Sequence, residues 1–542
     1  MDIQIDNLTL LLLGALVVLL LYQRLSTPSS LVHSLQLGGQ AAPAAVRQPG
    51  ESPNLPRLGD GTGHAAPSPP CWESEDCRYG RACSAAQRDA WQTPSRPLNS
   101  ATSSTHQYLT PEALAEVARL VPLGLRALFP KLASEEVTPI AVLLPPSPTT
   151  SLPTLLLALA SEPRHPLVIL DHPRRLASAL SGKDHPVPSL IVAHASAAKA
   201  IANLPTGVDV LLVGDPEGKV DIKARRWEEI WDPAEAATAD NHENTWSDAF
   251  GWFYAPDGEV LSATHMTITA GMAGIMALFP ADKRPGPRDV VASTLSLNTP
   301  FGLTLALAIV WCGSGLRLVG PTGWDAEADP NTELSLLAAE DQPVPTVLFA
   351  TPAYHAALVA HTAHALRSSL GRIAAAHKLQ GIRNGWVGRE GWADALVSGA
   401  RKGVMGGLVD SLRAILVVGD VSYAAASRSH AVLSLPLTRL TTSPYSTGPL
   451  FASHFYDLQS PVVPDAFAPV GGKAQKAHTG PPASNVEVLL RGVDEPMPEE
   501  GEVTGRVWVR GPSVLDRPGT VEGWSDAGVS AAVASNGTFV VA

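Results

Sequence analysis

From residue 108 onward, the chain alternates short apolar runs with longer segments of helical hydrophobic periodicity. The first helical segment, 108–129, begins with Thr110 as a predicted N-cap and Pro111 in the first turn. Continuous apolar strands that alternate with helices indicate a parallel sheet covered on both faces. The apolar runs that we predict as buried strands lie at 138–146, 166–171, 189–194 and 208–215.

A second series of short apolar runs alternating with helical segments begins near residue 289 and ends before Tyr445. Two such series predict an α/β body over 106–450, built of two mostly parallel sheets with helices packed between and around them. After Tyr445 the pattern changes to short strands separated by turn residues, which predicts a small β-rich subdomain over 451–542. The apolar runs of the second series lie at 289–297, 345–351 and 412–420.

The N-terminus carries an uninterrupted apolar run, LTLLLLGALVVLLLY, at 8–22. A membrane-spanning helix needs about 20 residues, so this run is at the short end. The preceding residues include Asp2 and Asp6, whereas a cleaved signal peptide begins with basic residues. We therefore predict a membrane anchor over 1–25, with Arg24 favouring a cytosolic location for the bulk of the chain. An interfacial helix and a buried core helix are the alternatives.

Residues 26–105 are rich in Pro, Ser, Gly and Ala and lack a periodic apolar pattern. This composition predicts a tether or an extended wrapping segment, in part disordered. Within it, Cys71, Cys77 and Cys83 are equally spaced at six residues, which does not fit the close cysteine pairs of zinc sites. Free thiols are the prediction for these cysteines, and no metal site is predicted.

The composition excludes few functions, but the net charge argues against a nucleic-acid partner. The chain has 542 residues, of which 45% are hydrophobic, and a formal net charge of −12. A negative chain without a basic run gives no electrostatic reason to expect a nucleic-acid partner. Four cysteines in this length fit a reducing compartment.

Three segments stand out between about residue 106 and residue 542: THMTITAGMAG from Thr264, the apolar segment 296–319, and GEVTGRVWVRGPSVL at 501–515. In this order they resemble the AMP-forming adenylating superfamily, and most closely its long-chain acyl-CoA synthetases. GEVTGRVWVRGPSVL at 501–515 resembles one family motif, and Thr264–His265 followed by MTITAGMAG resembles the end of the family's phosphate loop. The segment 296–319 resembles the one that builds the acyl pocket wall, which assigns Thr299, Phe301 and Gly302 to that wall. The resemblance implies ATP, Mg²⁺ and coenzyme A as co-reactants of an active relative.

The phosphate loop itself departs from the family. The family's Lys position holds Glu259 and its next Gly position holds Val260, and the loop from Tyr254 to His265 is about four residues short. Together with Asp257, Glu259 would repel a triphosphate rather than bind it. We expect a plain turn between a strand and the next element at this place.

Two further nucleotide motifs are also incomplete. By family position, Tyr445 would stack on adenine and Thr447 would contact phosphate, but Pro449 lies near the place of the Mg²⁺-binding Glu. Asp457 is too distant in sequence to replace that Glu. Trp524 matches the start of the ribose motif, but Val529 replaces its Asp, with Asp526 nearby.

The family's last feature is a C-terminal domain that brings a catalytic Lys to the acyl phosphate. The sequence given ends at Ala542, before such a domain, and we assign no catalytic residue. Thr264, His265, Tyr445, Thr447, Trp524 and Asp526 are therefore predicted as vestigial nucleotide-site residues.

These departures favour a membrane-tethered pseudoenzyme that binds an acyl chain or a protein partner. One alternative is an active long-chain fatty acid–CoA ligase with displaced residues. Another is a structural membrane scaffold without a ligand. The resemblance and the short apolar run imply the endoplasmic reticulum or the lipid-droplet surface, with membrane lipid bound through residues 8–22.

Overall fold

The computed structural model describes residues 10–18, 40–41, 48–55 and 57, and most of 111–541. The longer gaps within that last range are 215–223, 232–244, most of 325–342, 460–475 and 494–502.

The first half of the body forms a seven-stranded sheet in the order β5-β4-β3-β1-β2-β6-β7. Its strands are parallel except for β7, which pairs with β6 as an antiparallel hairpin. Strands β1 and β2 are buried along their whole length and β3 up to His194, as their continuous apolar sequences predict. The strands are β1 (Ile140–Leu143), β2 (Leu167–Ile169), β3 (Leu190–His194), β4 (Asp209–Val213), β5 (Arg225–Arg226), β6 (Ala249–Tyr254) and β7 (Val260–Thr264).

A six-stranded sheet follows in the order β13-β12-β11-β10-β8-β9. It is parallel except for β13, a short strand that runs antiparallel to β12. The prediction of two mostly parallel sheets in one α/β body is therefore confirmed. The strands are β8 (Val290–Ser293), β9 (Gly315–Leu318), β10 (Val347–Ala350), β11 (Ala414–Val418), β12 (Leu437–Thr441) and β13 (Phe451–Ala452).

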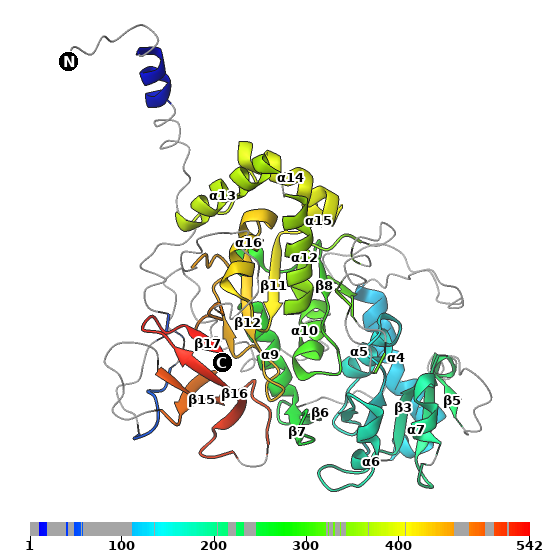
Figure 1. Cartoon of the computed structure of the whole chain (residues 1–542). Helices are drawn as coiled ribbons and strands as arrows, with labels where there is room; N and C mark the ends of the chain where they lie inside the picture. The colour runs from blue at the N-terminus through cyan, green and yellow to red at the C-terminus, as the bar shows by residue number, and fades with distance from the viewer. Residues whose placement is uncertain are drawn as a thin grey trace.

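Helices lie between the two parallel sheets and on their outer faces. One core joins apolar residues of both sheets to α4, α5, α9 and α10, and Figure 1 shows α9 and α10 in the middle of the body. Other clusters place α6 and α7 on the first sheet and α12 and α16 on the second. The helices are α4 (Pro111–Leu128), α5 (Pro148–Leu159), α6 (Leu176–Ala179), α7 (Ala198–Ile201), α9 (His265–Met276), α10 (Pro300–Trp311), α12 (Pro352–Ala365), α13 (Ser369–Arg383), α14 (Trp392–Met405), α15 (Leu408–Ser411) and α16 (Tyr423–Leu433).

A recurrent local signal starts three of these helices. Ser147, Thr299 and Thr351 each accept a hydrogen bond from a backbone amide at the start of a helix, and a proline follows each of them. Ser and Thr are favoured N-caps, and proline at the first helical position loses no intrahelical hydrogen bond. The chain therefore changes from strand to helix where its sequence indicates.

The C-terminal part forms the predicted β-rich unit, a four-stranded antiparallel sheet in the order β14-β15-β16-β17. Part of the predicted tether lies along its edge, because Ser52 and Leu55 donate backbone hydrogen bonds to Leu490 and Val488 at 2.8 and 2.9 Å. The strands are β14 (Glu487–Arg491), β15 (Val503–Arg510), β16 (Ser525–Val533) and β17 (Phe539–Val541).

The N-terminal membrane helix is not supported. Residues 10–18 are helical, with side chains such as Leu11 at 68% exposure. Within the described residues, no helix is both long enough and apolar enough to cross a membrane.

Candidate functional site

The turn between β6 and β7 stands where the sequence resembles the end of a phosphate loop. Ala255 donates a backbone hydrogen bond to Glu259 at 2.9 Å, and Gly258 donates one to Ala255 at 2.9 Å. The Glu259 amide donates to Asp257 Oδ1 at 3.1 Å, and Gly258 takes a left-handed φ of +93° that favours glycine. The backbone amides of this turn are thus engaged within the turn, which leaves them unavailable to a phosphate group.

Both carboxylates of the turn have partners from the C-terminal half of the chain. Asp257 Oδ2 accepts a hydrogen bond from the Tyr445 hydroxyl at 2.8 Å. Glu259 Oε2 lies 2.7 Å from Arg517 Nη2, and both side chains are about four-fifths buried, at 21% and 18% exposure. Burial opposes ionisation of Asp257, but hydrogen bonds from the Glu259 amide and the Tyr445 hydroxyl hold its pKa below the ordinary value.

Arg517 also covers the aromatic ring that would stack on adenine. Its guanidinium carbon lies 4.1 Å from the centroid of the Tyr445 ring, within the range of a cation–π contact. Gly528 approaches the same ring so closely that a Cβ at that position would lie 3.0 Å from Tyr445 Cε2. Tyr445 is 7% exposed, so little of its ring is open to a ligand.

Asp526 lies beside this cluster at the start of β16. Its carboxylate accepts hydrogen bonds from Arg506 Nε at 3.0 and 3.1 Å and from the Gly528 amide at 2.8 Å. Its backbone carbonyl accepts a further bond from Arg517 Nη1 at 2.9 Å. Trp524, two residues before it, is buried, and Arg510 lies 4.8 Å from its ring. We name Asp257, Glu259, Tyr445, Arg517 and Asp526 the turn cluster.

Thr264, His265 and Thr447 have structural contacts instead. Thr264 is the N-cap of α9, and its hydroxyl accepts a hydrogen bond from the Thr267 amide at 3.2 Å. The His265 ring packs edge-on against Phe250 at 5.5 Å, and burial lowers the pKa of His265 to about 4. The Thr447 hydroxyl is fully buried and donates to the Thr267 carbonyl at 2.8 Å.

Asp457 takes part in a separate buried cluster. Its carboxylate lies 2.9 Å from Arg439 Nη2 and 3.5 Å from His478 Nε2. Asp457 is fully buried, and this ion pair joins the segment after β13 to β12. The Asp457 carboxylate therefore serves to link these two segments of the chain.

The residues assigned to an acyl pocket wall lie at the start of α10. Thr299 is an exposed N-cap whose hydroxyl accepts a hydrogen bond from the Gly302 amide at 3.1 Å. Phe301 is 4% exposed and belongs to the central core. At Gly302 an added Cβ would lie 2.0 Å from the Ser296 carbonyl oxygen, which explains why this position holds glycine.

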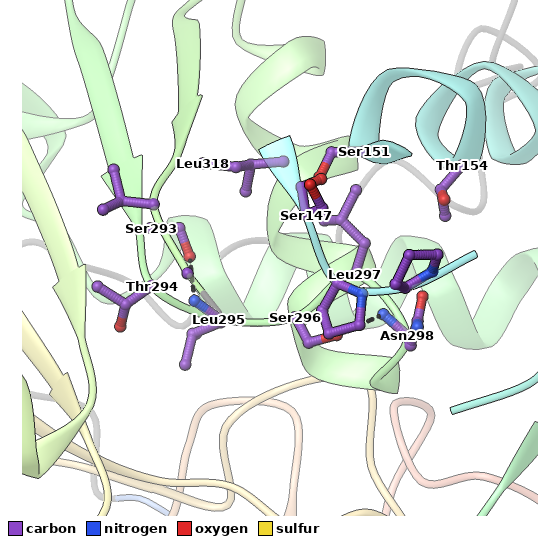
Figure 2. A pocket seen from close by; sticks show the side chains of 14 residues that line it. Ser147, Ser151, Thr154, Ser293, Thr294, Leu295, Ser296, Leu297, Asn298 and Leu318 are labelled. Carbon is purple, nitrogen blue, oxygen red and sulfur yellow. Dashed lines mark hydrogen bonds between the residues drawn. The ribbon is translucent and has the colours of Figure 1, made fainter. Parts of the chain in front are cut away.

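A small cavity lies beside this segment and is shown in Figure 2. It is lined largely by Ser, Thr, Asn and Leu side chains from the loops after β1 and β8, including Ser147, Ser293 and Asn298. Its volume of about 20 Å³ is enough for roughly one water molecule, and far below that of a fatty acyl chain.

A metal ion would be held by a group of suitable side chains that lie close together in the fold. Among them, no three His, Cys, Asp or Glu side chains are grouped so as to hold a metal. Cys71, Cys77 and Cys83 fall outside the described residues.

Sequence reasoning missed the central residue of the turn cluster. Arg517 follows the motif-like segment 501–515 and carries no pattern of its own. Its partners Glu259 and Tyr445 are 258 and 72 positions earlier in the chain, so only the fold brings the three together. The one available signal was the pair of acidic residues in the turn, because carboxylates shielded from water require a cationic partner.

No family model and no curated protein matches the sequence, whereas solved structures with a similar fold are numerous. A benzoate CoA ligase from Burkholderia xenovorans is 17% identical over 80% of this chain and 74% of its own, with a TM-score of 0.53. A Mycobacterium tuberculosis fatty acyl CoA synthetase is 14% identical over 79% of this chain and 72% of its own, with a TM-score of 0.52.

The N-terminal domain of FACL13, also from Mycobacterium tuberculosis, is 15% identical over 80% of this chain and 92% of its own, with a TM-score of 0.51. The likeness to AMP-forming adenylating enzymes is therefore confirmed at the level of the fold. Such identities do not carry over an activity.

Proposed function

We propose that this protein has the body of an adenylating enzyme but does not carry out ATP-dependent ligation. The observation that carries the proposal is the position of Arg517, which pairs with Glu259 and covers the ring of Tyr445. The chain's own side chains thereby occupy the place where adenine and phosphate would be expected to bind.

Electrostatics supports this proposal. A nucleotide at the turn would have to displace Arg517 from Glu259 and the Tyr445 hydroxyl from Asp257. A hydrogen bond to a charged group contributes about 1.5–3 kcal/mol when it is buried, and about 1 kcal/mol where water screens it, as at Asp257. Once displaced, the two carboxylates would face the negative phosphates at close range.

The residues present do not fit ATP with Mg²⁺ in other respects. The Thr447 hydroxyl is already bound to the Thr267 carbonyl, and Pro449 offers no carboxylate near the expected metal position. Val529 cannot accept a hydrogen bond from ribose, and leaving a buried hydroxyl unpaired costs about 1–3 kcal/mol.

The retained role that we propose is binding of an acyl chain or a protein partner at a membrane. The apolar helix at 10–18 supports this view, since its leucine and valine side chains are 47–68% exposed. Residues 8–22 would supply the membrane contact, at the endoplasmic reticulum or the lipid-droplet surface.

The second candidate is an active long-chain fatty acid–CoA ligase, which would require ATP, Mg²⁺ and coenzyme A. It is favoured by the fold shared with CoA ligases and by the carboxylate of Asp526, which is 29% exposed beside Tyr445. Asp526 and Thr447 are the first residues to test under this alternative.

Isothermal titration of the full chain in detergent with ATP·Mg²⁺ tests the proposal, with a fatty acyl-AMP analogue as the second titrant. We expect no binding heat with ATP from protein whose thermal unfolding shows that it is folded. Micromolar binding of ATP·Mg²⁺ would contradict the proposal and favour the ligase.

Two variants test whether the turn cluster prevents ATP from binding. Arg517→Ala opens the Tyr445 ring, and combined with Glu259→Lys it also reverses the charge of the turn. The matched control is Arg491→Ala, which also removes an arginine that pairs with a glutamate, Glu51, and lies 4.1 Å from an aromatic ring, that of Trp508, neither of them in the turn cluster. Weak nucleotide binding by the double variant alone would support blockage by the cluster.

A further inference from the structure

The helices α13 and α14 expose apolar side chains on a common face. Leu370 and Ile373 of α13 are 63% and 57% exposed, and Trp392 and Leu396 of α14 are 54% and 42% exposed. The rings of His377 and Trp392 are 5.0 Å apart, which places these two helix faces next to each other. We name Leu370, Ile373, Trp392 and Leu396 the outer face.

A shallow groove of about 510 Å³ continues the outer face. Leu370 and Leu396 line it together with Gly399, Ala400 and Gly403. The small residues on α14 keep this surface open, because they project little or nothing from the helix. The groove is therefore a surface depression that can receive apolar groups from outside.

The outer face is not needed to hold the two helices in place. On the buried side, Asp394 forms ion pairs with Lys378 and with Arg401, whose Nη2 lies 2.6 Å from Asp394 Oδ2. Arg401 also donates to the Val432 carbonyl at 3.2 Å and to Ser434 Oγ at 2.8 Å. This network joins α13 and α14 to the C-terminal end of α16 through buried residues, and none of the four outer-face residues takes part in these bonds.

Charge distinguishes this region from the rest of the molecule. Residues 366–406 contain seven Lys or Arg against two Asp or Glu, whereas the whole chain has a net charge of −12. Lys378 and Arg401 are buried with Asp394, but Arg372, Arg383 and Lys402 are exposed. The outer face thus lies on two helices that also expose Arg372, Arg383 and Lys402, with Glu390 exposed in the loop between them.

We propose that the outer face binds an anionic lipid surface. Apolar and tryptophan side chains that enter the interface, with cationic residues beside them, are the features by which helices lie on such membranes. A second copy of the chain fits less well, since it would bring the exposed cationic side chains of two such helix pairs together. Figure 1 shows α13 and α14 at the outer end of the body.

This inference goes beyond the proposed function, because it requires neither that the turn cluster block nucleotide binding nor that the N-terminal helix contact the membrane. Contact through the outer face would orient the body on the membrane, with α13 and α14 against the lipid. The turn cluster plays no part in it.

The test is partition of the full chain into phosphatidylcholine vesicles with and without phosphatidylserine. The parent protein carries Leu12→Glu and Leu16→Glu, which remove the apolar contact of the N-terminal helix. We expect this parent to bind the anionic vesicles and the pair Trp392→Gln and Leu396→Gln to weaken partition roughly tenfold. The matched control pair is Trp311→Gln and Leu152→Gln, whose side chains have similar exposures of 50% and 41%.

Equal partition of the outer-face and control variants would overturn the proposal, and so would a parent that binds no anionic vesicle. Sedimentation velocity tests whether a second copy of the chain binds the outer face instead of lipid. A dimer that the outer-face variant dissociates, with vesicle partition unchanged, would assign the face to a second copy instead. Titration with ATP·Mg²⁺ on the same variants is expected to stay unchanged, so failure here is separable from failure of the proposed function.

Discussion

The turn between β6 and β7 and the helix that follows it are neighbours in sequence but differ in what constrains them. Helix α9 is almost entirely buried, and its Gly271 approaches Thr447 closely enough that a Cβ would lie 2.5 Å from Thr447 Oγ1. The turn is closed by its own hydrogen bonds and by Arg517. The comparison teaches that packing can preserve a helix motif whether or not the preceding turn binds a nucleotide.

Gly271→Val is expected to have the largest effect, because it inserts three carbon atoms into the contact between α9 and Thr447. Overpacking at a rigid site of this kind should lower the free energy of unfolding by about 3–4 kcal/mol. Urea unfolding of the variant measures the change. The contrast is Gly258→Ala in the turn, where the added Cβ meets only the guanidinium of Arg175 at 2.9 Å, the end of a flexible side chain that also donates to the Ala255 and Pro256 carbonyls, although the positive φ of Gly258 carries strain as well. Similar losses at both positions would break the comparison.

Acid should act on α9 at a higher pH than on the turn. Burial lowers the pKa of His265 from 6.5 to about 4, so the unfolded chain takes up the proton first. The stability that comes from the neutral ring is complete above pH 6.5 and is lost as the pH falls towards 4, by up to about 3 kcal/mol.

The measurement is the free energy of unfolding between pH 7 and pH 4.5 for the parent and His265→Phe. We expect a smaller loss in the variant, although His355, His430 and His478, which also have pKa values of about 4, keep part of the slope. Asp257 affects stability at a lower pH than His265 does. Because its pKa is below the ordinary value of 3.8, its contribution to the free energy of unfolding is lost only as the pH falls below 3.8. Identical slopes would show that His265 does not carry the effect.

Arg517→Ala should lower the free energy of unfolding by about 1–2 kcal/mol. It removes a partly buried partner of Glu259 and a cation–π contact with Tyr445. Thermal unfolding at low and high salt measures this. The double variant Arg517→Ala with Glu259→Gln should recover part of the loss, because it removes the unpaired carboxylate. A loss that stays undiminished in the double variant would exclude that pair as its origin.

Tyr445→Phe should have the smallest effect, about 0.5–1.5 kcal/mol, because it removes one hydrogen bond to Asp257 and leaves the ring in place. Burial and the bond to Asp257 raise the pKa of Tyr445, so spectroscopic titration of the tyrosines should lose a group above the ordinary value of 10.0. Loss of a group at or below 10.0 would contradict the hydrogen bond.

Much of the candidate site could be located from the sequence, but its state could not. Asp257, Glu259, Tyr445 and Asp526 of the turn cluster were singled out by their positions relative to family motifs, and the acidic turn was predicted to repel phosphate. The sequence did not reveal that Thr447 spends its hydroxyl on the Thr267 carbonyl, because that contact joins residues 180 positions apart. No separate helix was predicted within residues 366–406, where α13 and α14 form although each contains glycine, a poor helix former.

The sequence by itself determined the two series of buried strands and several helix starts. Continuous apolar runs cannot face water, and a Ser or Thr followed by Pro caps a helix through local bonds alone. Only the tertiary structure decided that Arg517 covers Tyr445 and that Trp392 and Leu396 face outward. Those outcomes depend on which surfaces meet after the sheets form, and local propensity carries no information about such distant partners.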